Sequence, residues 1–258
     1  MHGILWLLAN AALAQPPDAS ALEGLWAARR SAFASAGLPT PPLTDAHWAK
    51  VAGGGVAKLR VTEDGADRAV GARWMSHSPE AVWIAILDDT HDTIVGGLTE
   101  QQLAGTVPGH KVLYQHLDLP RPFDDRHWVL VIENNPALYA QGVWEREWTL
   151  DPRMAGALVE LPAALGELAS GSVYTPINEG GWWLIPGEGG VLVVYQVRTD
   201  IGGNIPEELV LRYAMSTLDE MMEHVDERAG QIPAHYDAAH FPILRADNSP
   251  IPADRLSP

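Results

Sequence analysis

The sequence contains no cysteine among its 258 residues, which excludes disulfides, thiolate metal sites and cysteine nucleophiles. Lysine is also scarce, since only Lys50, Lys58 and Lys111 occur, and the formal net charge is −16. No run of basic residues is present, so electrostatics disfavours both nucleic-acid binding and docking of a basic patch onto an anionic membrane. We therefore expect no nucleic-acid partner.

The signatures of common hydrolases and nucleotide-dependent enzymes are absent as well. There is no G-x-S-x-G elbow, no H-E-x-x-H pair, no phosphate-binding glycine loop and no dinucleotide fingerprint. The string DDTHD at 88–92 has the residue types of metal ligands, as do His235 and His240, but their spacing is not diagnostic. A polar end to the preceding helix explains DDTHD more simply. We expect no cofactor and no metal.

The apolar stretch at the N-terminus is short. It runs from Ile4 to Leu13, which is too short to span a bilayer, and Ala12-Leu13-Ala14 resembles a signal-peptidase site. We predict that residues 1–14 are a signal peptide cleaved near Ala14, so that the mature protein is periplasmic or secreted in a bacterium. The stretch lacks the basic residues usual before such a core, and a buried N-terminal helix is the alternative.

The residues that are abundant indicate one globular α+β unit. The sequence is 47% hydrophobic and 19% charged, which is enough for a sizeable core. Period-two alternation predicts strands at 56–62, 68–75, 111–119, 127–134, 143–150, 172–177, 181–186 and 191–200. Shorter helical segments are expected at 18–36, at 44–51, from Ser78 onward and within 153–171. Many strands with a few separate helices favour a mostly antiparallel sheet.

The last regular element is predicted to be a long amphipathic helix from Pro206 to Gly230. Its apolar residues recur at helical spacing, as Leu211, Ala214, Met215, Leu218, Met221, Met222, Val225 and Ala229. Such a helix is about 36 Å long, enough to cross a sheet. Because methionine adapts to ligands of different shape, the helix is a candidate lid over an apolar cavity. Ordinary packing of a helix on a sheet is the alternative.

Four segments resemble the START (StAR-related lipid-transfer) domain family of the helix-grip (SRPBCC) superfamily. They are DIGGNIPEEL at 200–209, PFDDRHWV at 122–129, WWLIP with VLVVYQV at 182–197, and SPEAVWIAILDD at 78–89. They occur in the order and spacing of the family, although His127 stands where the family has a second aspartate. The resemblance implies a helix-grip fold: a curved, mostly antiparallel sheet that grips a long C-terminal helix, with an internal apolar cavity.

The same resemblance sets the expected organisation of the chain. Residues 15–42 form an N-terminal helix and a proline-rich linker, residues 43–230 form the START-like domain, and residues 231–258 form an extended tail. In the family, a loop that corresponds to Asp125 and Arg126 lies near the cavity mouth. These two residues are therefore candidates for gating, with local pairing inside the turn as the simpler role.

Candidate ligand-binding residues are taken from one side of each strand and one stripe of the last helix. They are Trp128, Leu130, Trp144, Arg146, Trp148, Trp182, Leu184, Val193, Tyr195, Leu211, Met215, Leu218 and Met222. The side of each strand that faces the cavity is implied by the resemblance, because period alone does not choose it. Core packing is the alternative role for the aromatic residues among them.

Charged residues on strand 143–150 alternate with tryptophans. Glu145 and Glu147 are expected on one face, which is either solvated or a pair for acid–base chemistry. Arg146 shares the other face with Trp144 and Trp148. It either orients a polar headgroup or hydroxyl, or stacks on the indoles from outside.

The function expected from this sequence is non-catalytic binding and periplasmic transport of a hydrophobic lipid. The lipid is a sterol, hopanoid, carotenoid, fatty acyl compound or phospholipid. We expect a monomer, and transient contact with a membrane is left open. A cyclase or aromatase acting on polyketides is the enzymatic alternative, since one fold supports several functions. The third possible function is that of a sensor or assembly module with a filled core.

Overall fold

The structure is a computed structural model that describes residues 15–63, 66–87, 97–105, 107, 109–155, 161–203, 205–235 and 243–252. The predicted signal peptide at 1–14 and the DDTHD string at 88–92 lie outside these residues. Within the described part of the chain, no helix is both long and apolar enough to cross a membrane.

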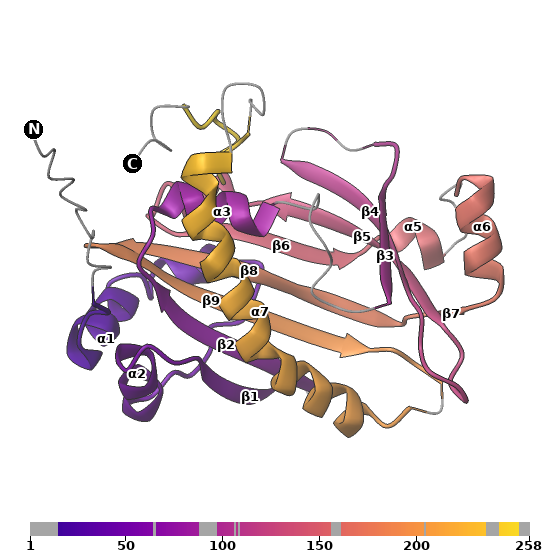
Figure 1. Ribbon diagram of the computed structural model, residues 1–258, viewed down its shortest axis with the longest axis horizontal. Coiled ribbons are helices and arrows are strands. Elements are labelled where there is room, and N and C mark those ends of the chain that lie inside the picture. Colours follow the sequence, from indigo (N-terminus) through magenta and orange to yellow (C-terminus); the bar gives the residue numbers. More distant parts are fainter. Residues whose placement is uncertain are drawn as a thin grey trace, which may run out of the picture.

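One nine-stranded sheet runs through the molecule (Figure 1). Its order is β1-β2-β9-β8-β6-β5-β4-β3, all antiparallel, and the short β7 pairs with β5 in parallel. The strands are β1 (Ala57–Glu63), β2 (Ala66–Met75), β3 (Leu98–Gln102), β4 (His110–Leu117), β5 (Arg126–Asn134), β6 (Trp144–Leu150), β7 (Val173–Tyr174), β8 (Ile177–Gly187) and β9 (Gly190–Asp200). The predicted antiparallel α+β architecture is therefore confirmed.

Helices begin where the sequence offers caps. Asp18 accepts a hydrogen bond from the Ala21 backbone N–H, and Ser78 Oγ accepts one from the Ala81 N–H. The helical elements are α1 (Ala19–Ala27), the 3₁₀ turn η1 (Ala32–Ser35), α2 (Asp45–Ala52), α3 (Pro79–Leu87), α4 (Pro136–Tyr139), α5 (Pro152–Ala155), α6 (Ala163–Ser170) and α7 (Glu207–His235).

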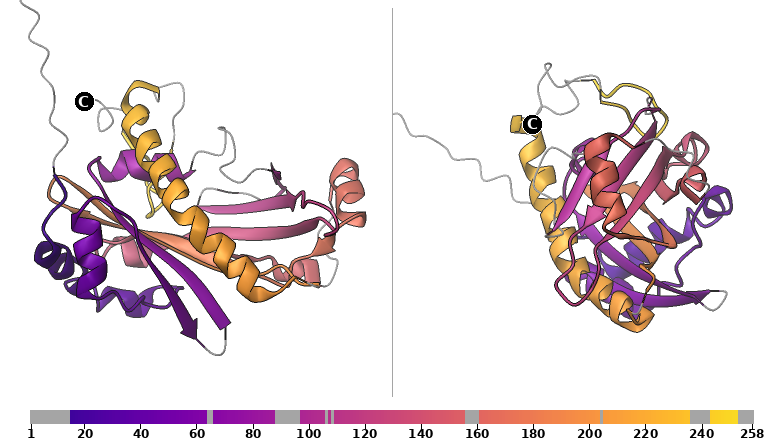
Figure 2. Two further views of the ribbon diagram at one scale, coloured as in Figure 1. Left: turned by 60° about the horizontal axis from the view of Figure 1, so that its bottom comes forward. Right: turned by 90° about the vertical axis from the view of Figure 1, so that its right-hand side faces the viewer.

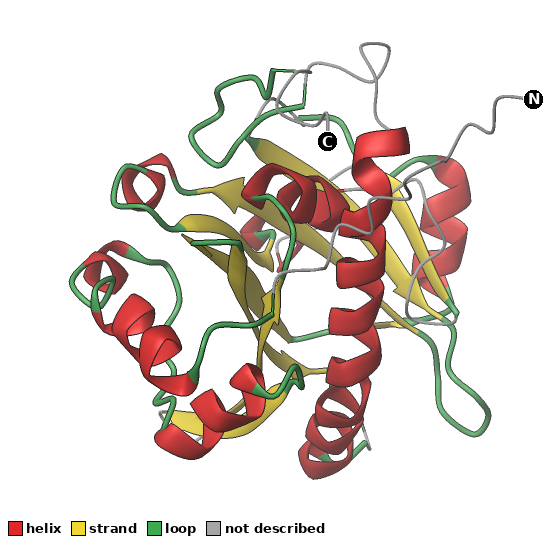
Figure 3. Ribbon diagram, turned by 60° about the vertical axis from the view of Figure 1, so that its left-hand side comes forward, coloured by secondary structure: helices red, strands yellow, loops and turns green. Residues whose placement is uncertain are grey.

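The sheet has two faces with different cover. We call the inner face the one that carries Val193 and Tyr195, which packs against α3 and α7. The outer face carries Trp183 and Val194, which pack against residues of α1, η1 and α2. Figure 2 shows the orange α7 and the indigo N-terminal helices on opposite sides of the strands. Figure 3 shows the same arrangement by secondary structure, with the longest helix lying along the sheet.

Helix α7 is held close to β1 and β2. Gly71 lies under it, and a Cβ at this position would come within 3.3 Å of Leu218 Cδ2 and of Met222 Cε. The absence of a side chain at Gly71 thus allows the helix to approach the strand. Two ion pairs fix the helix position, Lys58–Asp219 at 2.5 Å and Arg73–Asp226 at 2.9 Å.

Helix α7 continues past its predicted end. It runs to His235, five residues beyond Gly230, and contains Pro233. Ile232 is buried and lies seven residues after Val225, so it extends the apolar stripe by two turns. Burial of this stripe outweighs the low helix propensity of Gly230. Part of the tail also packs on α3, where Trp83 Nε1 donates to the Leu244 carbonyl at 2.8 Å.

Candidate functional site

The strand register places all nine predicted wall residues of the sheet on the inner face. Arg146 pairs with Trp182, Trp182 pairs with Tyr195, and paired residues in neighbouring strands share a face. The same register joins β5 to β6 with Ile132 opposite Trp148, which places Trp128 and Leu130 on this face too. The ligand-binding role of these nine residues stays a prediction.

The inner-face residues form two apolar clusters. Trp144, Leu184 and Val193 pack with Met222 of α7 in one cluster. Trp128 and Leu130 belong to a second, with Trp148 packed against it. An aromatic row connects the two clusters, because the Tyr195 ring lies 5.7 Å from Trp148 and 4.6 Å from Trp182 between centroids.

Packing at the middle of the inner face is incomplete. Leu184 and Val193 are fully buried, whereas Trp148, Trp182 and Tyr195 are only partly buried although α7 crosses this face. Desolvation nevertheless raises the pKa of the Tyr195 phenol above its ordinary value, so the group stays neutral. These aromatic surfaces are placed to contact a further apolar group.

The predicted stripe of α7 faces the sheet. Leu211, Leu218 and Met222 are buried, and Met215 between them is partly buried. Glu220 and Glu223, on the opposite side of the helix, are exposed. Met215 is therefore the residue of this stripe that retains uncovered surface.

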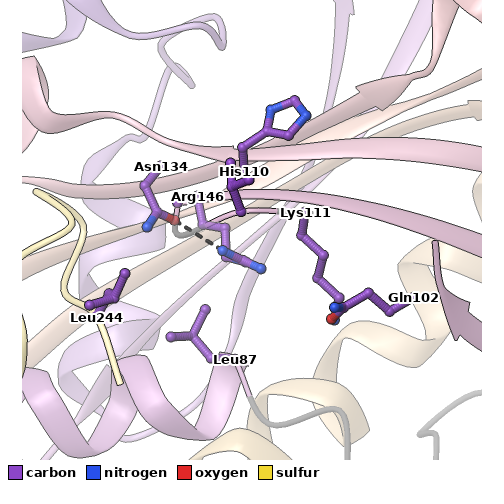
Figure 4. A pocket seen from close by; sticks show the side chains of 9 residues that line it. Leu87, Gln102, His110, Lys111, Asn134, Arg146 and Leu244 are labelled. Carbon is purple, nitrogen blue, oxygen red and sulfur yellow. Dashed lines mark hydrogen bonds between the residues drawn. The ribbon is translucent and has the colours of Figure 1, made fainter. Parts of the chain in front are cut away.

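Arg146 extends from the inner face into a pocket of about 200 Å³ (Figure 4). The pocket lies where the ends of α3, β3 and β5, the start of β4 and part of the tail meet. The residues that line it are Leu87, Gln102, Val107, Gly109, His110, Lys111, Asn134, Arg146 and Leu244. Charged and polar groups thus line this space together with leucine side chains.

The electrostatics of the pocket are set by two cations. Arg146 Nη1 donates to Asn134 Oδ1 at 3.0 Å, and burial lowers the Arg146 pKa to about 10. Burial, and then the charge of Arg146, lower the pKa of Lys111 to about 8. His110 points away from the arginine in Figure 4, and its Nδ1 is 2.8 Å from Glu133 Oε1.

The prediction that Glu145 and Glu147 form a solvated face is wrong. Both lie on the outer face, but Glu145 is 0% exposed and accepts hydrogen bonds from Trp183 Nε1 and from Asn135 Nδ2 at 2.6 Å. Burial raises the pKa of Glu145, although these hydrogen bonds oppose the rise. The N-terminal elements cover this face, and strand alternation cannot reveal such cover.

The two residues of the predicted gating loop fix the start of β5. Arg126 is 2% exposed and donates to the carbonyls of Ile201 at 2.6 Å and Gly202 at 3.0 Å. Asp125 Oδ1 accepts a hydrogen bond from the Leu119 N–H at 3.0 Å. Arg126 thereby ties this loop to the glycine turn before α7, and its gating role stays a prediction.

Four polar residues of the pocket are not among the sites predicted from sequence, and they are Gln102, His110, Lys111 and Asn134. A signal for one of them was present. Lys111 is the first residue of the strand predicted at 111–119 and shares a face of that strand with Leu113, so a basic group among apolar residues was visible in the sequence. Gln102 and Asn134 have no comparable signal, since polar residues at strand ends are common.

Comparison with known proteins identifies the fold. No protein-family model and no curated protein matches the sequence. Among solved structures, a STAR-related lipid transfer protein from Xanthomonas axonopodis is similar with a TM-score of 0.54 and 19% identity, over 69% of this chain and 94% of that one. Human StAR-related lipid transfer protein 5 has a TM-score of 0.54 and 14% identity, over 82% and 97%. Human STARD10 has a TM-score of 0.54 and 12% identity, over 70% and 71%.

The predicted helix-grip fold, an antiparallel sheet with a long C-terminal helix, is confirmed by these similarities and by the topology. The internal apolar cavity that the resemblance also implied stays a prediction. At these identities the likeness concerns the fold, and function has to be argued from the site.

Proposed function

We propose that the protein binds one hydrophobic lipid between the inner face and α7, without covalent chemistry, and carries it. The observation that supports this most is the row of partly buried aromatic rings, Trp148, Tyr195 and Trp182, on the face of the sheet that α7 packs against. Met215 on that helix is partly buried as well. Removing such surface from water contributes about 25 cal/mol per Å². A lipid that covers these rings therefore gains affinity from apolar contact.

The similar proteins and the site together support the proposed ligand class. Two of the three similar structures are named as lipid-transfer proteins, and the inner face offers aromatic and methionine side chains. Such walls suit a sterol, hopanoid, carotenoid, fatty acyl compound or phospholipid. If residues 1–14 are removed on export, as the sequence predicts, carriage takes place in the periplasm, and mature protein begins at Gln15.

Entry of a whole lipid requires movement. The pocket of about 200 Å³ is smaller than sites for drug-sized ligands, which measure roughly 300–1,000 Å³. A lipid therefore fits when α7, or the loop that Arg126 ties to Gly202, moves away from the inner face. Binding and release are then coupled to this opening.

Lipid extraction followed by mass spectrometry tests the proposal. Mature protein from its native cell is expected to release one lipid class at about one molecule per chain, and a fluorescent lipid analogue is expected to be displaced by that lipid. Protein that carries no lipid and binds no analogue would contradict the proposal. Turnover of an added polyketide, with no stable lipid complex, would favour the cyclase alternative.

A further inference from the structure

Arg146 has an unusual setting for a partly buried cation. Its side chain comes from the middle of the sheet, and within the described part of the chain its hydrogen-bond partner is the neutral amide of Asn134. Among the residues that the structure describes, no carboxylate forms an ion pair with it. Burying a charge is costly unless it is paired, so this position favours a ligand that brings negative charge.

A second cation converges on the same pocket. Lys111 on β4 pairs with Ile132 of β5, and Arg146 on β6 pairs with Asn134 of β5, so the two bases flank β5 on the inner face. Both side chains line the pocket, with Gln102 beside Lys111 (Figure 4). Burial first, and then the charge of Arg146, lowers the pKa of Lys111, and burial lowers that of Arg146, so an anion between the two side chains offsets the cost of burying each charge.

The apolar site begins next to this pocket. Arg146 pairs directly with Trp182, whose ring packs against Tyr195 at 4.6 Å. A molecule with its charged end at Arg146 can therefore lie along these rings toward α7. The pocket alone, at about 200 Å³, is large enough for a small oxyanion group and a short piece of chain.

We infer that this pocket binds the oxyanion headgroup, carboxylate or phosphate, of an amphiphilic lipid, with Arg146 and Lys111 as its charged contacts. The inference rests on the proposed lipid-binding function and narrows it to anionic amphiphiles. Arg146 supplies a planar fork of donors suited to two oxygens, and Lys111 supplies a single strong donor. Gln102 and Asn134 provide further polar groups at the same end.

The test compares ligands that differ only in the head. Oleate and oleyl alcohol share one chain, as do dioleoyl phosphatidic acid and dioleoylglycerol, and each competes against a fluorescent lipid analogue. The wild-type protein is expected to bind at least one anionic member ten-fold or more tightly than its neutral counterpart. Acetate and inorganic phosphate are expected to compete at least a thousand-fold more weakly. Equal affinity of free anion and amphiphile would overturn the inference in favour of a site for small anions.

Variants separate the headgroup site from the apolar site. Arg146→Met is expected to weaken binding of the anionic lipid ten-fold or more and to leave the neutral lipid within two-fold. Lys111→Met is also expected to weaken binding of the anionic lipid and to leave binding of the neutral lipid within two-fold. Lys50→Met removes an exposed lysine of α2 and is the matched control. It is expected to leave the affinities for both the anionic and the neutral lipid unchanged. Circular dichroism checks that each variant folds.

The outcomes distinguish the two proposals. If no lipid binds at all, the proposed function fails and the headgroup site fails with it. If anionic and neutral lipids bind equally well to the wild-type protein, the function stands and the headgroup site is overturned, whatever the variants do. The comparison of anionic and neutral lipids on the wild-type protein therefore tests the headgroup site even if Arg146→Met does not fold.

Discussion

Trp182 and Trp183 are neighbours on β8, yet their surroundings differ completely. Trp183, on the outer face, is 0% exposed and stacks on Phe33 with ring centroids 4.5 Å apart and planes 6° from parallel. Trp182, on the inner face, is partly buried and tilted against Tyr195. The same residue type thus completes a core on one face and leaves surface available on the other.

The charged residues of β6 repeat this contrast. Glu145, on the outer face, is enclosed and receives hydrogen bonds from Trp183 and Asn135. Arg146, on the inner face, extends into a pocket beside Lys111. The outer face therefore contributes mainly to stability, and the inner face retains the apolar and charged surface that we propose for a ligand.

The largest effect is expected on the outer face. Trp183→Ala removes a fully buried ring and leaves Glu145 without one hydrogen bond, so the free energy of unfolding is expected to fall by about 3–5 kcal/mol. Trp182→Ala is expected to cost roughly half as much, because Trp182 is only partly buried. Urea unfolding followed by circular dichroism measures both. Equal losses would remove the distinction between the two faces.

Met215→Glu is the next largest change and acts on the inner face. It places a carboxylate against the apolar ligand site, and the cost of burying that charge is expected to abolish displacement of a fluorescent lipid analogue. The variant is expected to keep its fold, because Met215 is only partly buried. Full binding by a folded Met215→Glu protein would show that α7 does not form the ligand site.

A smaller, pH-dependent effect is expected from Glu147 on the outer face. Burial first, and then the charges of Glu145 and Glu133, raise the Glu147 pKa from 4.5 to about 7. The folded state therefore holds this proton more tightly, and the resulting stability is complete below pH 4.5 and is lost as the pH rises through 7. Glu147→Gln is expected to gain about 1 kcal/mol relative to the parent between pH 5 and pH 8, after discounting for partial exposure.

The measurement for Glu147 is the difference in unfolding free energy between parent and variant at these two pH values. Glu133→Gln is a useful comparison, because it removes one of the charges that act on Glu147 and is expected to reduce the slope without abolishing it. A difference between parent and Glu147→Gln that is constant with pH would show that Glu147 titrates normally.

The smallest effect is expected from Glu220→Lys, which changes an exposed residue on the outer side of α7. Such surface changes usually alter stability by less than about 0.5 kcal/mol. Lipid binding should match that of the parent, which makes this variant the control for Met215→Glu. A marked loss of binding would indicate that the exposed side of α7 also takes part.

Much of the fold could be predicted from sequence because its signals are local. Period-two alternation located the strand from Val191 onward, and the motif after Asp200 identified the turn before α7. Alternation also placed Arg146 on the same side of β6 as Trp144 and Trp148, and the resemblance implied that this side faces α7. These features depend on residues close together in the chain.

The parts that were missed depend on contacts between distant segments. The cover over Glu145 comes from the segment that contains Phe33, more than a hundred residues earlier. Likewise, Lys111 and Arg146 line the same pocket only because β4 and β6 both flank β5. Sequence pattern shows which side chains of one strand share a face, and strand order decides which side chains of other strands lie beside them.

The most direct test of the contrast between the faces follows the indole N–H signals of the tryptophans by NMR. Protein labelled with ¹⁵N-tryptophan is titrated with oleate, and the signals are assigned with single Trp→Phe variants. The signals of Trp148 and Trp182, on the inner face, are expected to shift with saturation at one molecule per chain. Those of Trp48 and Trp183, in the outer core, are expected to stay in place. Shifts confined to Trp48 and Trp183, or none on the inner face, would contradict a ligand site between the inner face and α7.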